Sequence, residues 1–202
     1  MRQVRVYSAD PLAAHSEQEL GRAASAHVLR VLRLRAGDAL TLFDGRGGEY
    51  PARLVRTGRA AAVVEVGAHL PLERESPLAI TLLQSLARGE KMDFIVQKGT
   101  ELGVTRIVPV AVGRSVMRVP QGREGRKLEH WRAVAASACE QCGRNRLPQI
   151  DAPVDLPSAL ALATSSEMRV LLSPAAPDTL SSVVRAHGTG GTGTPCPSIA
   201  LL

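Results

Sequence analysis

At 202 residues, the chain is long enough for one large domain or two small ones with a buried core. Its composition, 45% apolar and 22% charged, is typical of a globular rather than a disordered protein. A net charge of +6 favours a polyanionic partner, although a soluble basic surface explains this charge equally well. Aromatic residues make up only 2% of the chain, which excludes base stacking on an aromatic sheet as the main mode of RNA recognition.

The sequence also bounds the cellular compartment. No apolar run approaches the ~20 residues that a membrane helix needs, and no apolar segment of a secretory signal follows the N-terminal arginines. Three cysteines, an odd number, argue against a disulfide framework and for a reducing environment. We therefore predict a cytoplasmic protein without a membrane segment.

The first part of the chain, residues 1–70, is predicted to be mostly β. Glycine turns separate short alternating segments, and one short helix lies among them at residues 23–32. The expected strands are at 38–44, 49–56 and 60–66.

The second part, residues 78–202, follows a charged, proline-flanked linker at 71–77 and alternates strands with helices. Such alternation predicts a mostly parallel sheet with helices on its faces, and so an α/β domain. The expected strands are at 78–84, 107–110, 168–172 and 198–202, and the expected helices at 90–102, 124–142 and 179–187.

Two of these helices carry apolar residues at helical spacing, which predicts one buried face on each. A glycine able to take a left-handed conformation, Gly103, is expected to end the first of them. The predicted buried residues are Met92, Ile95, Val96 and Leu102 on the first helix, and Leu128, Trp131, Ala135, Ala138 and Cys142 on the second.

Three dense motifs resemble those of the ribosomal RNA small subunit methyltransferase E family. They lie at residues 88–118, which open Arg-Gly-Glu-Lys-Met-Asp, at 140–148, Glu-Gln-Cys-Gly-Arg-Asn-Arg-Leu-Pro, and at 27–45, which end Leu-Phe-Asp-Gly. The resemblance runs in order along essentially the whole chain. It implies an N-terminal PUA-like β-barrel over 1–70 for RNA docking, followed by a SPOUT-type, trefoil-knotted α/β domain.

The resemblance implies an activity as well. Members of this family transfer a methyl group from S-adenosylmethionine to N-3 of a uridine in 16S rRNA of the small ribosomal subunit, and SPOUT enzymes are generally homodimers. Ser173 and Pro174 follow a predicted buried strand, and ligands of α/β sheets bind at such carboxyl ends. The cofactor contacts implied here are Leu172, Ser173, Pro174, Leu201 and Leu202, while a simple turn is the alternative for the first three.

The family pattern continues beyond the strand at 198–202 with two further loops that build much of the cofactor pocket. We therefore expect the α/β domain to be incomplete at its C-terminus in this chain. The alternative function is a non-catalytic, RNA-binding fragment.

Arginines are the main candidates for RNA contact. Arg30 and Arg33 are predicted to lie one turn apart on the same helix face, with Arg46 in a glycine-rich hairpin loop nearby. A solvated helix face is the alternative for the first two. The full predicted RNA-binding set is Arg30, Arg33, Arg46, Arg114, Arg118 and Arg146.

Methylation at N-3 requires that the imino proton leave, which needs a general base or cations near the uracil carbonyls. Glu101 and Glu140 are the candidate bases, and Arg144 the candidate stabiliser of negative charge. Because Arg144 and Arg146 follow a helix end, interaction with the helix dipole is an alternative for both.

Two further motifs lack the context that their usual chemistry needs. Cys139 and Cys142 match C-x-x-C, but no second pair completes a zinc site, and a helix end does not activate a thiol. The glycine string at 188–193 matches G-x-G-x-x-G, yet it follows a helix instead of opening one, which predicts a loop. No metal site is predicted.

Overall fold

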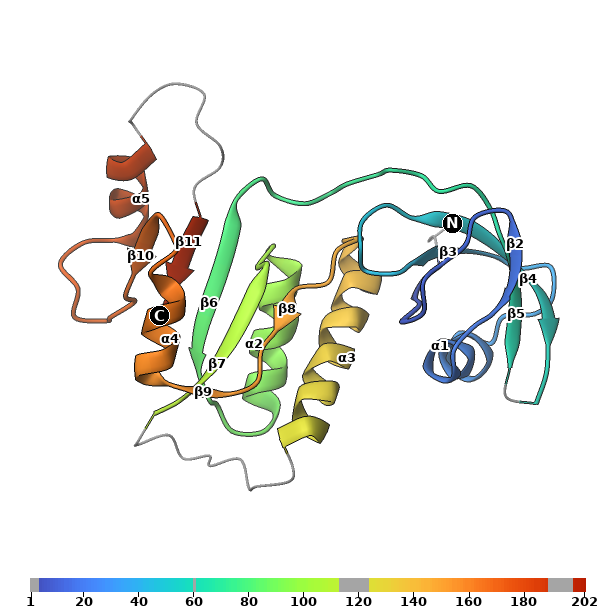
Figure 1. Cartoon of the computed structure of the whole chain (residues 1–202), viewed down its shortest axis with the longest axis horizontal. Helices are drawn as coiled ribbons and strands as arrows, with labels where there is room; N and C mark the ends of the chain where they lie inside the picture. The colour runs from blue at the N-terminus through green and yellow to red at the C-terminus, as the bar shows by residue number, and fades with distance from the viewer. Residues whose placement is uncertain (1–3, 60, 113–123, 189–197) are drawn as a thin grey trace. The chain divides into compact units, whose positions relative to one another are not determined.

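The computed structural model describes residues 4–59, 61–112, 124–188 and 198–202, and it divides into two compact units (Figure 1). Unit 1 comprises Met1–Glu75 and Ala133–Leu147, and unit 2 comprises Ser76–Arg132 and Pro148–Leu202. Residues 78–202 were predicted to form one domain. In the structure, the second half of helix α3 (Glu124–Cys142) and the loop after it group with the N-terminal sheet instead.

Unit 1 is built on a five-stranded sheet with the order β1-β3-β4-β5-β2. β1 and β3 are parallel, whereas the other neighbours are antiparallel. Alternating residues such as Leu40, Leu54 and Val64 point into one apolar core, as the pleat of a half-buried sheet requires. The strands are β1 (Arg5–Tyr7), β2 (Ser16–Glu19), β3 (Ala39–Phe43), β4 (Tyr50–Thr57) and β5 (Ala62–Val66).

The helix of unit 1 differs from the prediction at its second half. It begins as α1 (Arg22–Ala26), continues as a wider π-helical turn, η1 (His27–Val31), and is capped by Leu32. Arg33 then takes a left-handed φ of 54°, so it lies outside the helix. The prediction that Arg30 and Arg33 share one helix face was therefore wrong.

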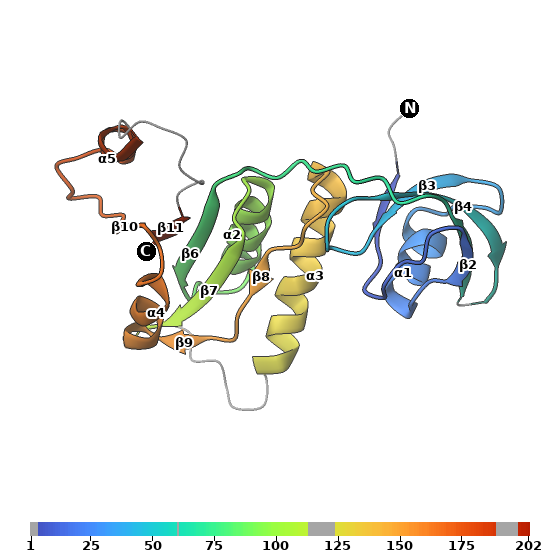
Figure 2. The same cartoon turned by 45° about the horizontal axis from the view of Figure 1, so that its top comes forward.

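Unit 2 contains a sheet whose neighbours are all parallel, in the order β10-β11-β6-β7-β8, with β9 pairing with β7 (Figures 1 and 2). This confirms the predicted α/β domain with a parallel sheet. The strands are β6 (Ala79–Ser85), β7 (Arg106–Ala111), β8 (Gln149–Ile150), β9 (Val154–Asp155), β10 (Met168–Val170) and β11 (Ser198–Leu201).

Two helices cover opposite faces of this sheet. A Cβ added at Gly99 of α2 (Glu90–Glu101) would lie 3.7 Å from Ile107 Cδ1, so this glycine packs against one face. Ala159 of α4 (Leu156–Ala163) packs with Val108, the next residue of the same strand, which points to the other face. A third helix, α5 (Leu180–Gly188), precedes β11.

Two predicted core positions were wrong. Leu102 is 79% exposed because α2 ends at Glu101 and the chain turns at Gly103, whose φ of 94° confirms the predicted stop. On α3, Cys142 is exposed and Cys139 is the buried cysteine, whereas Trp131 is buried as predicted.

Several short elements were not predicted: β1, β2, β8, β9 and α4. Strands of two to four residues are too short to show an alternating pattern. Helix α4 did carry a signal, because the Asp155 carboxylate accepts a hydrogen bond of 2.9 Å from the Ser158 amide and Pro157 lies in the first turn.

Candidate functional site

The carboxyl ends of β10 and β11 lie side by side in unit 2. Their pairing continues beyond the strands, since the Leu202 amide donates to Val170 O at 2.9 Å and the Leu172 amide donates to Leu202 O at 2.8 Å. The chain then turns at Ser173, whose carbonyl accepts from the Ala176 amide at 3.1 Å. This edge is where an α/β sheet offers its ligand crevice.

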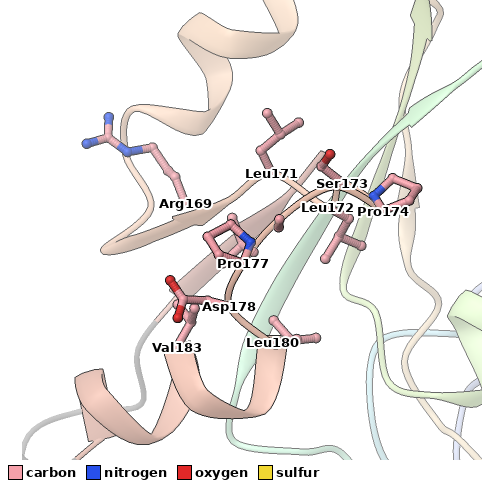
Figure 3. A pocket seen from close by; sticks show the side chains of 11 residues that line it. Arg169, Leu171, Leu172, Ser173, Pro174, Pro177, Asp178, Leu180 and Val183 are labelled. Atoms are coloured by element: carbon pink, nitrogen blue, oxygen red, sulfur yellow. The ribbon is translucent and has the colours of Figure 1, made fainter.

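A cavity of about 600 Å³, here called the loop cavity, opens at this edge between the end of β10 and the start of α5 (Figure 3). Its volume falls in the range of small-molecule sites, roughly 300–1,000 Å³. The residues that line it are Arg169, Val170, Leu171, Leu172, Ser173, Pro174, Ala176, Pro177, Asp178, Leu180 and Val183.

The lining of the loop cavity combines exposed leucines with a few polar groups. Leu171 and Leu172 are 67% and 53% exposed and point in opposite directions from the chain (Figure 3). Leu180 projects from the first turn of α5 and Asp178 lies just before that helix (Figure 3). Exposed leucines gathered at a cavity mark a binding surface, and polar groups among them orient a ligand.

A second, smaller cavity of about 340 Å³, here called the sheet cavity, lies on the α4 side of the same strand ends. Arg169, Val170 and Leu171 line both cavities. The sheet cavity is otherwise mostly apolar and includes Leu83, Leu160 and Leu202.

The structure therefore brings four of the five residues predicted to contact a cofactor to these two cavities. Leu172, Ser173 and Pro174 line the loop cavity, and Leu202 lines the sheet cavity. Leu201 is half-buried within β11 and is not among the lining residues described.

The other eight residues that line the loop cavity were not predicted, and they include Arg169, Asp178, Leu180 and Val183. A helix-start signal marked this place in the sequence, because Thr179 caps α5 by accepting a hydrogen bond of 3.2 Å from the Ser182 amide. Residues between a strand end and the next helix start face the ligand crevice of an α/β sheet. Asp178 and Leu180 could have been found by that rule.

Of the other predicted residues, Arg144 lies in a polar network within unit 1. At its centre, the buried Glu49 carboxylate is paired with Arg5 at 2.5 Å and Arg74 at 2.9 Å. Arg5 also donates to Asn145 Oδ1 at 2.6 Å. Burial alone would raise the pKa of Glu49, but the hydrogen bonds from Arg74 and Arg5 outweigh it and hold this pKa below its usual range.

Arg144 belongs to this network, because its carbonyl accepts a hydrogen bond of 3.2 Å from Arg5 Nη2, whereas Glu140 has other partners. Arg144 is only 5% exposed, and its Nη2 lies 2.7 Å from Glu75 Oε2. Glu140 Oε1 accepts a hydrogen bond of 2.9 Å from the Tyr7 amide, and its Oε2 lies 3.8 Å from His27 Nε2. The candidate base Glu140 and the candidate stabiliser Arg144 therefore bind different partners.

Glu101 lies at the end of α2, where Lys98 Nζ and Gln97 Nε2 donate to it at 2.6 and 2.9 Å. The Lys98 hydrogen bond, followed by that of Gln97, lowers the pKa of Glu101. A carboxylate with a lowered pKa is a weaker proton acceptor.

Four of the six predicted RNA-binding arginines lie in unit 1. Arg30, Arg33, Arg46 and Arg146 are exposed. Arg114 and Arg118 lie outside the described residues. The Cys139 thiol is poorly reactive, because a hydrogen bond with Cys142, together with burial, raises the pKa of Cys139 far above its usual value.

Within the described ranges, no helix is both long and apolar enough to cross a bilayer. Over the same residues, no three His, Cys, Asp or Glu side chains gather in a way that would hold a metal ion.

Comparison with known families now identifies the class of protein. Residues 74–194, more than half of the chain, match the model of an RNA methyltransferase domain. Residues 20–67 match the model of an RNA methyltransferase PUA domain. The chain therefore has the architecture of an RNA methyltransferase with an N-terminal PUA domain.

Named relatives narrow the class. The ribosomal RNA small subunit methyltransferase E of Buchnera aphidicola subsp. Acyrthosiphon pisum is 30% identical over 152 residues, or 75% of this chain and 60% of that protein. The Bacillus subtilis protein of the same name is 30% identical over 124 residues, or 61% of this chain and 48% of that protein. The matches thus span about half to three fifths of these two relatives.

Solved structures agree in fold. A putative methyltransferase from Legionella pneumophila with bound S-adenosylmethionine superposes with a TM-score of 0.88 at 31% identity, covering 100% of this chain and 79% of that one. A ribosomal RNA small subunit methyltransferase E from Neisseria gonorrhoeae bound to S-adenosylmethionine gives a TM-score of 0.82 at 31% identity, covering 99% and 79%. This chain belongs to the ribosomal RNA small subunit methyltransferase E family, which confirms the resemblance seen in the sequence and the SPOUT-type fold it implied.

Proposed function

We propose that the protein binds S-adenosylmethionine at the carboxyl ends of β10 and β11 and methylates N-3 of a uridine in 16S rRNA. One observation carries the proposal: the predicted cofactor residues 172–174 line the loop cavity in a chain whose solved relatives hold that cofactor. We further propose that it acts in the cytoplasm, as a homodimer, on the small ribosomal subunit.

The residues of the loop cavity suit this cofactor chemically. Leu172 and Leu180 offer exposed apolar surface that a purine ring would cover. The Asp178 carboxylate can accept hydrogen bonds from ribose hydroxyls, and the Arg169 guanidinium can pair with an amino-acid carboxylate. When bound, the cofactor would supply a methyl group already activated on a sulfonium, so that the task left to the protein is to position donor and acceptor.

The proton on the uridine nitrogen needs an acceptor. Of the two predicted carboxylates, Glu101 is a weaker proton acceptor than an ordinary glutamate, because hydrogen bonds from Lys98 and Gln97 lower its pKa. We therefore place Glu140 first. Arg144, buried against Glu75, is better suited to holding the loop after α3 than to contacting uracil, because releasing it would leave the Glu75 carboxylate without this partner.

The RNA contacts proposed for Arg30, Arg33, Arg46 and Arg146 are supported by the exposure of all four. Arginines that grip phosphates supply affinity and depend strongly on salt. This role accords with the net charge of +6 and with the low aromatic content.

The test has two parts, cofactor binding and methyl transfer. Calorimetric titration of S-adenosylmethionine into this chain, beside a longer version that covers the full length of the relatives, measures the first. Methyl transfer to small ribosomal subunits, followed by digestion and mass spectrometry, identifies the methylated atom. We expect binding and 3-methyluridine with the longer protein.

Each outcome has a distinct meaning. If only the longer protein binds, this chain is a fragment that contributes the RNA-docking unit and part of the pocket. Absence of binding by both would remove the cofactor assignment. A methylated nucleoside other than 3-methyluridine would remove the proposed target atom while leaving the cofactor assignment in place.

A further inference from the structure

The glycine-rich loop after β3 pairs with the loop after α3, and both belong to unit 1. The Gly47 amide donates to Asn145 O at 3.2 Å, and the Leu147 amide donates to Gly45 O at 3.3 Å. These two bonds set Arg46 directly opposite Arg146 in an isolated antiparallel bridge. In this bonding pattern the two opposed side chains leave the backbone on the same side and close together.

The positive charges of Arg46 and Arg146 repel each other in this arrangement, and an anion between or beside them would offset the repulsion. Arg146 has one, because its Nε lies 3.2 Å from Glu73 Oε2 and its Nη2 donates to Glu73 Oε1 at 3.4 Å. The Arg46 guanidinium, by contrast, has no hydrogen-bond or ion-pair partner among the described residues, and only its backbone amide is bonded, to Asp44 Oδ1 at 3.1 Å.

The Glu73 carboxylate is bound as a phosphate would be. In addition to Arg146, the backbone amide of Gly48 donates to Glu73 Oε1 at 2.9 Å. A forked guanidinium together with a backbone N–H in a glycine loop is a recurrent donor set for phosphate oxygens.

The glycines of this loop make the approach possible. A Cβ at Gly47, whose φ is 109°, would lie 2.6 Å from Arg146 Nη2 and would overlap Glu73 Oε1. The loop therefore leaves space that is filled by a carboxylate and a guanidinium instead of a side chain of its own.

We propose that Gly48 N–H, Arg146 and Arg46 form a site for one phosphate of the RNA backbone, and that Glu73 occupies this site in the free protein. An incoming phosphate displaces Glu73 and gains both arginines. This proposal rests on the proposed RNA substrate. It adds a phosphate site that a side chain of the protein itself, Glu73, occupies when RNA is absent.

Displacement costs little because the pair is exposed. The side chains of Arg146 and Glu73 are 55% and 38% exposed, and exposed ion pairs are weak. Glu73 also lies in the exposed segment 71–74, so it can leave without opening a core. A backbone phosphodiester carries two charged oxygens, as the Glu73 carboxylate does, and each of them can face one of the two guanidinium groups.

The proposal can be tested by measuring the affinity of the full 202-residue chain for a fluorescein-labelled oligouridylate of about 15 nucleotides, by fluorescence anisotropy. Glu73→Gln removes the competitor and should tighten binding up to about fivefold, the fold-change that corresponds to an exposed ion pair. Glu17→Gln is the matched control, since it also raises the net charge by one and frees an arginine, Arg56, from an exposed pair at 3.1 Å. It should change the affinity less than twofold.

Two further measurements locate the effect. Arg146→Gln should weaken binding and reduce the salt dependence, log K against log salt, by about 0.7, the value for one phosphate contact on a single strand. The NMR shift of the Gly48 amide in the wild-type protein should move on addition of the oligouridylate, because its partner changes from carboxylate to phosphate. The same addition should leave the amide of Gly58, in a separate turn of unit 1, in place.

The outcomes separate this inference from the function on which it rests. The proposal that Glu73 competes with phosphate would be wrong if Glu73→Gln and Glu17→Gln bound the oligouridylate with equal affinity. It would also be wrong if the protein bound the oligouridylate while the NMR shift of the Gly48 amide stayed unchanged. If neither the wild type nor any variant binds the oligouridylate, both the phosphate site and the RNA contacts of unit 1 fail, while the titration of S-adenosylmethionine still judges the cofactor assignment.

Discussion

Two regions of the molecule treat their side chains differently. The buried network of unit 1 pairs its charged side chains within the protein, whereas the edge of unit 2 at the ends of β10 and β11 leaves apolar side chains exposed. In unit 1, the charged groups of Arg5, Glu49 and Arg144 are buried and paired within the protein. In unit 2, Leu171, Leu172 and Leu180 are left exposed around a cavity. The first region is organised for its own stability, since a buried charge without a partner is costly. The second is organised for something outside it, because exposed leucines at a cavity gain only when a ligand covers them.

The largest effect on stability is expected from a substitution at the centre of the unit 1 network. Glu49→Ala leaves Arg5 and Arg74 without their shared carboxylate and should lower the free energy of unfolding of unit 1 by about 3–5 kcal/mol. Urea unfolding followed by amide exchange on β3 and β4 measures this loss. Trp131, the single tryptophan, lies in unit 2, so its fluorescence follows the unfolding of that unit separately.

The control for this substitution is Glu17→Ala, which removes an exposed partner of Arg56. It should cost no more than about 1 kcal/mol. Equal losses for the two variants would mean that burial of the Glu49 network contributes nothing to stability.

Acid should weaken the same centre without any substitution. Because the folded pKa of Glu49 lies below its ordinary value of 4.5, the stability from its ion pairs is fully present above pH 4.5. It is lost as the pH falls through the lowered pKa of the folded state. Urea midpoints of the wild type and of Glu49→Gln, compared from pH 7 to pH 3, should differ at neutral pH and converge in acid; a constant difference would contradict the linkage.

At the edge of unit 2, the expected loss is in binding and not in stability. Leu172→Ala should weaken S-adenosylmethionine binding about tenfold, or about 1.4 kcal/mol, because it removes apolar surface that the cofactor would cover. The free energy of unfolding should change by less than about 0.5 kcal/mol, as at other exposed positions.

Leu102→Ala is the matched control for this variant, since Leu102 is exposed on unit 2 but does not line the loop cavity. Calorimetric titration of both variants, in whichever protein binds the cofactor, makes the comparison. Identical affinities would remove Leu172 from the site.

The smallest expected effect compares two glycines of unit 2. Gly103 has a φ of 94° at the end of α2, so Gly103→Ala should cost about 1 kcal/mol. Gly125 lies within α3 with open space around it, so Gly125→Ala should stabilise by roughly 0.5–1 kcal/mol. Trp131 fluorescence during urea unfolding measures the stability of both variants. If the free energy of unfolding changed in the same direction for both, the argument from glycine conformation would be wrong.

Long periodic segments were predictable because their signals are local. The helix 124–142 was expected at the bounds it has, and Gly103 ended the helix before it as predicted, since capping depends on neighbouring residues. The same local rules failed at Leu102 and Cys142. Both continue a helical spacing, but they lie where the helix ends and the chain turns away from the core.

The candidate cofactor site was partly predictable for a similar reason. Residues 172–174 follow a strand, and the position of ligands at strand ends is a rule of the α/β fold. Asp178 and Leu180 lie where the same rule applies, whereas Val183, further along α5, lines the cavity only because of where the fold places that helix.

The sequence by itself determined the family, the division into a β-rich and an α/β part, and the residues at the end of β10. These follow from motifs, periodicity and turns, which act over a few residues. Only the tertiary structure decided which arginines are buried and which face solvent, because Arg144 and Arg146 are two residues apart and yet bind Glu75 and Glu73, about seventy positions earlier. The pairing of Arg46 with Arg146 is likewise set by two backbone hydrogen bonds between distant loops, and no local pattern encodes such a contact.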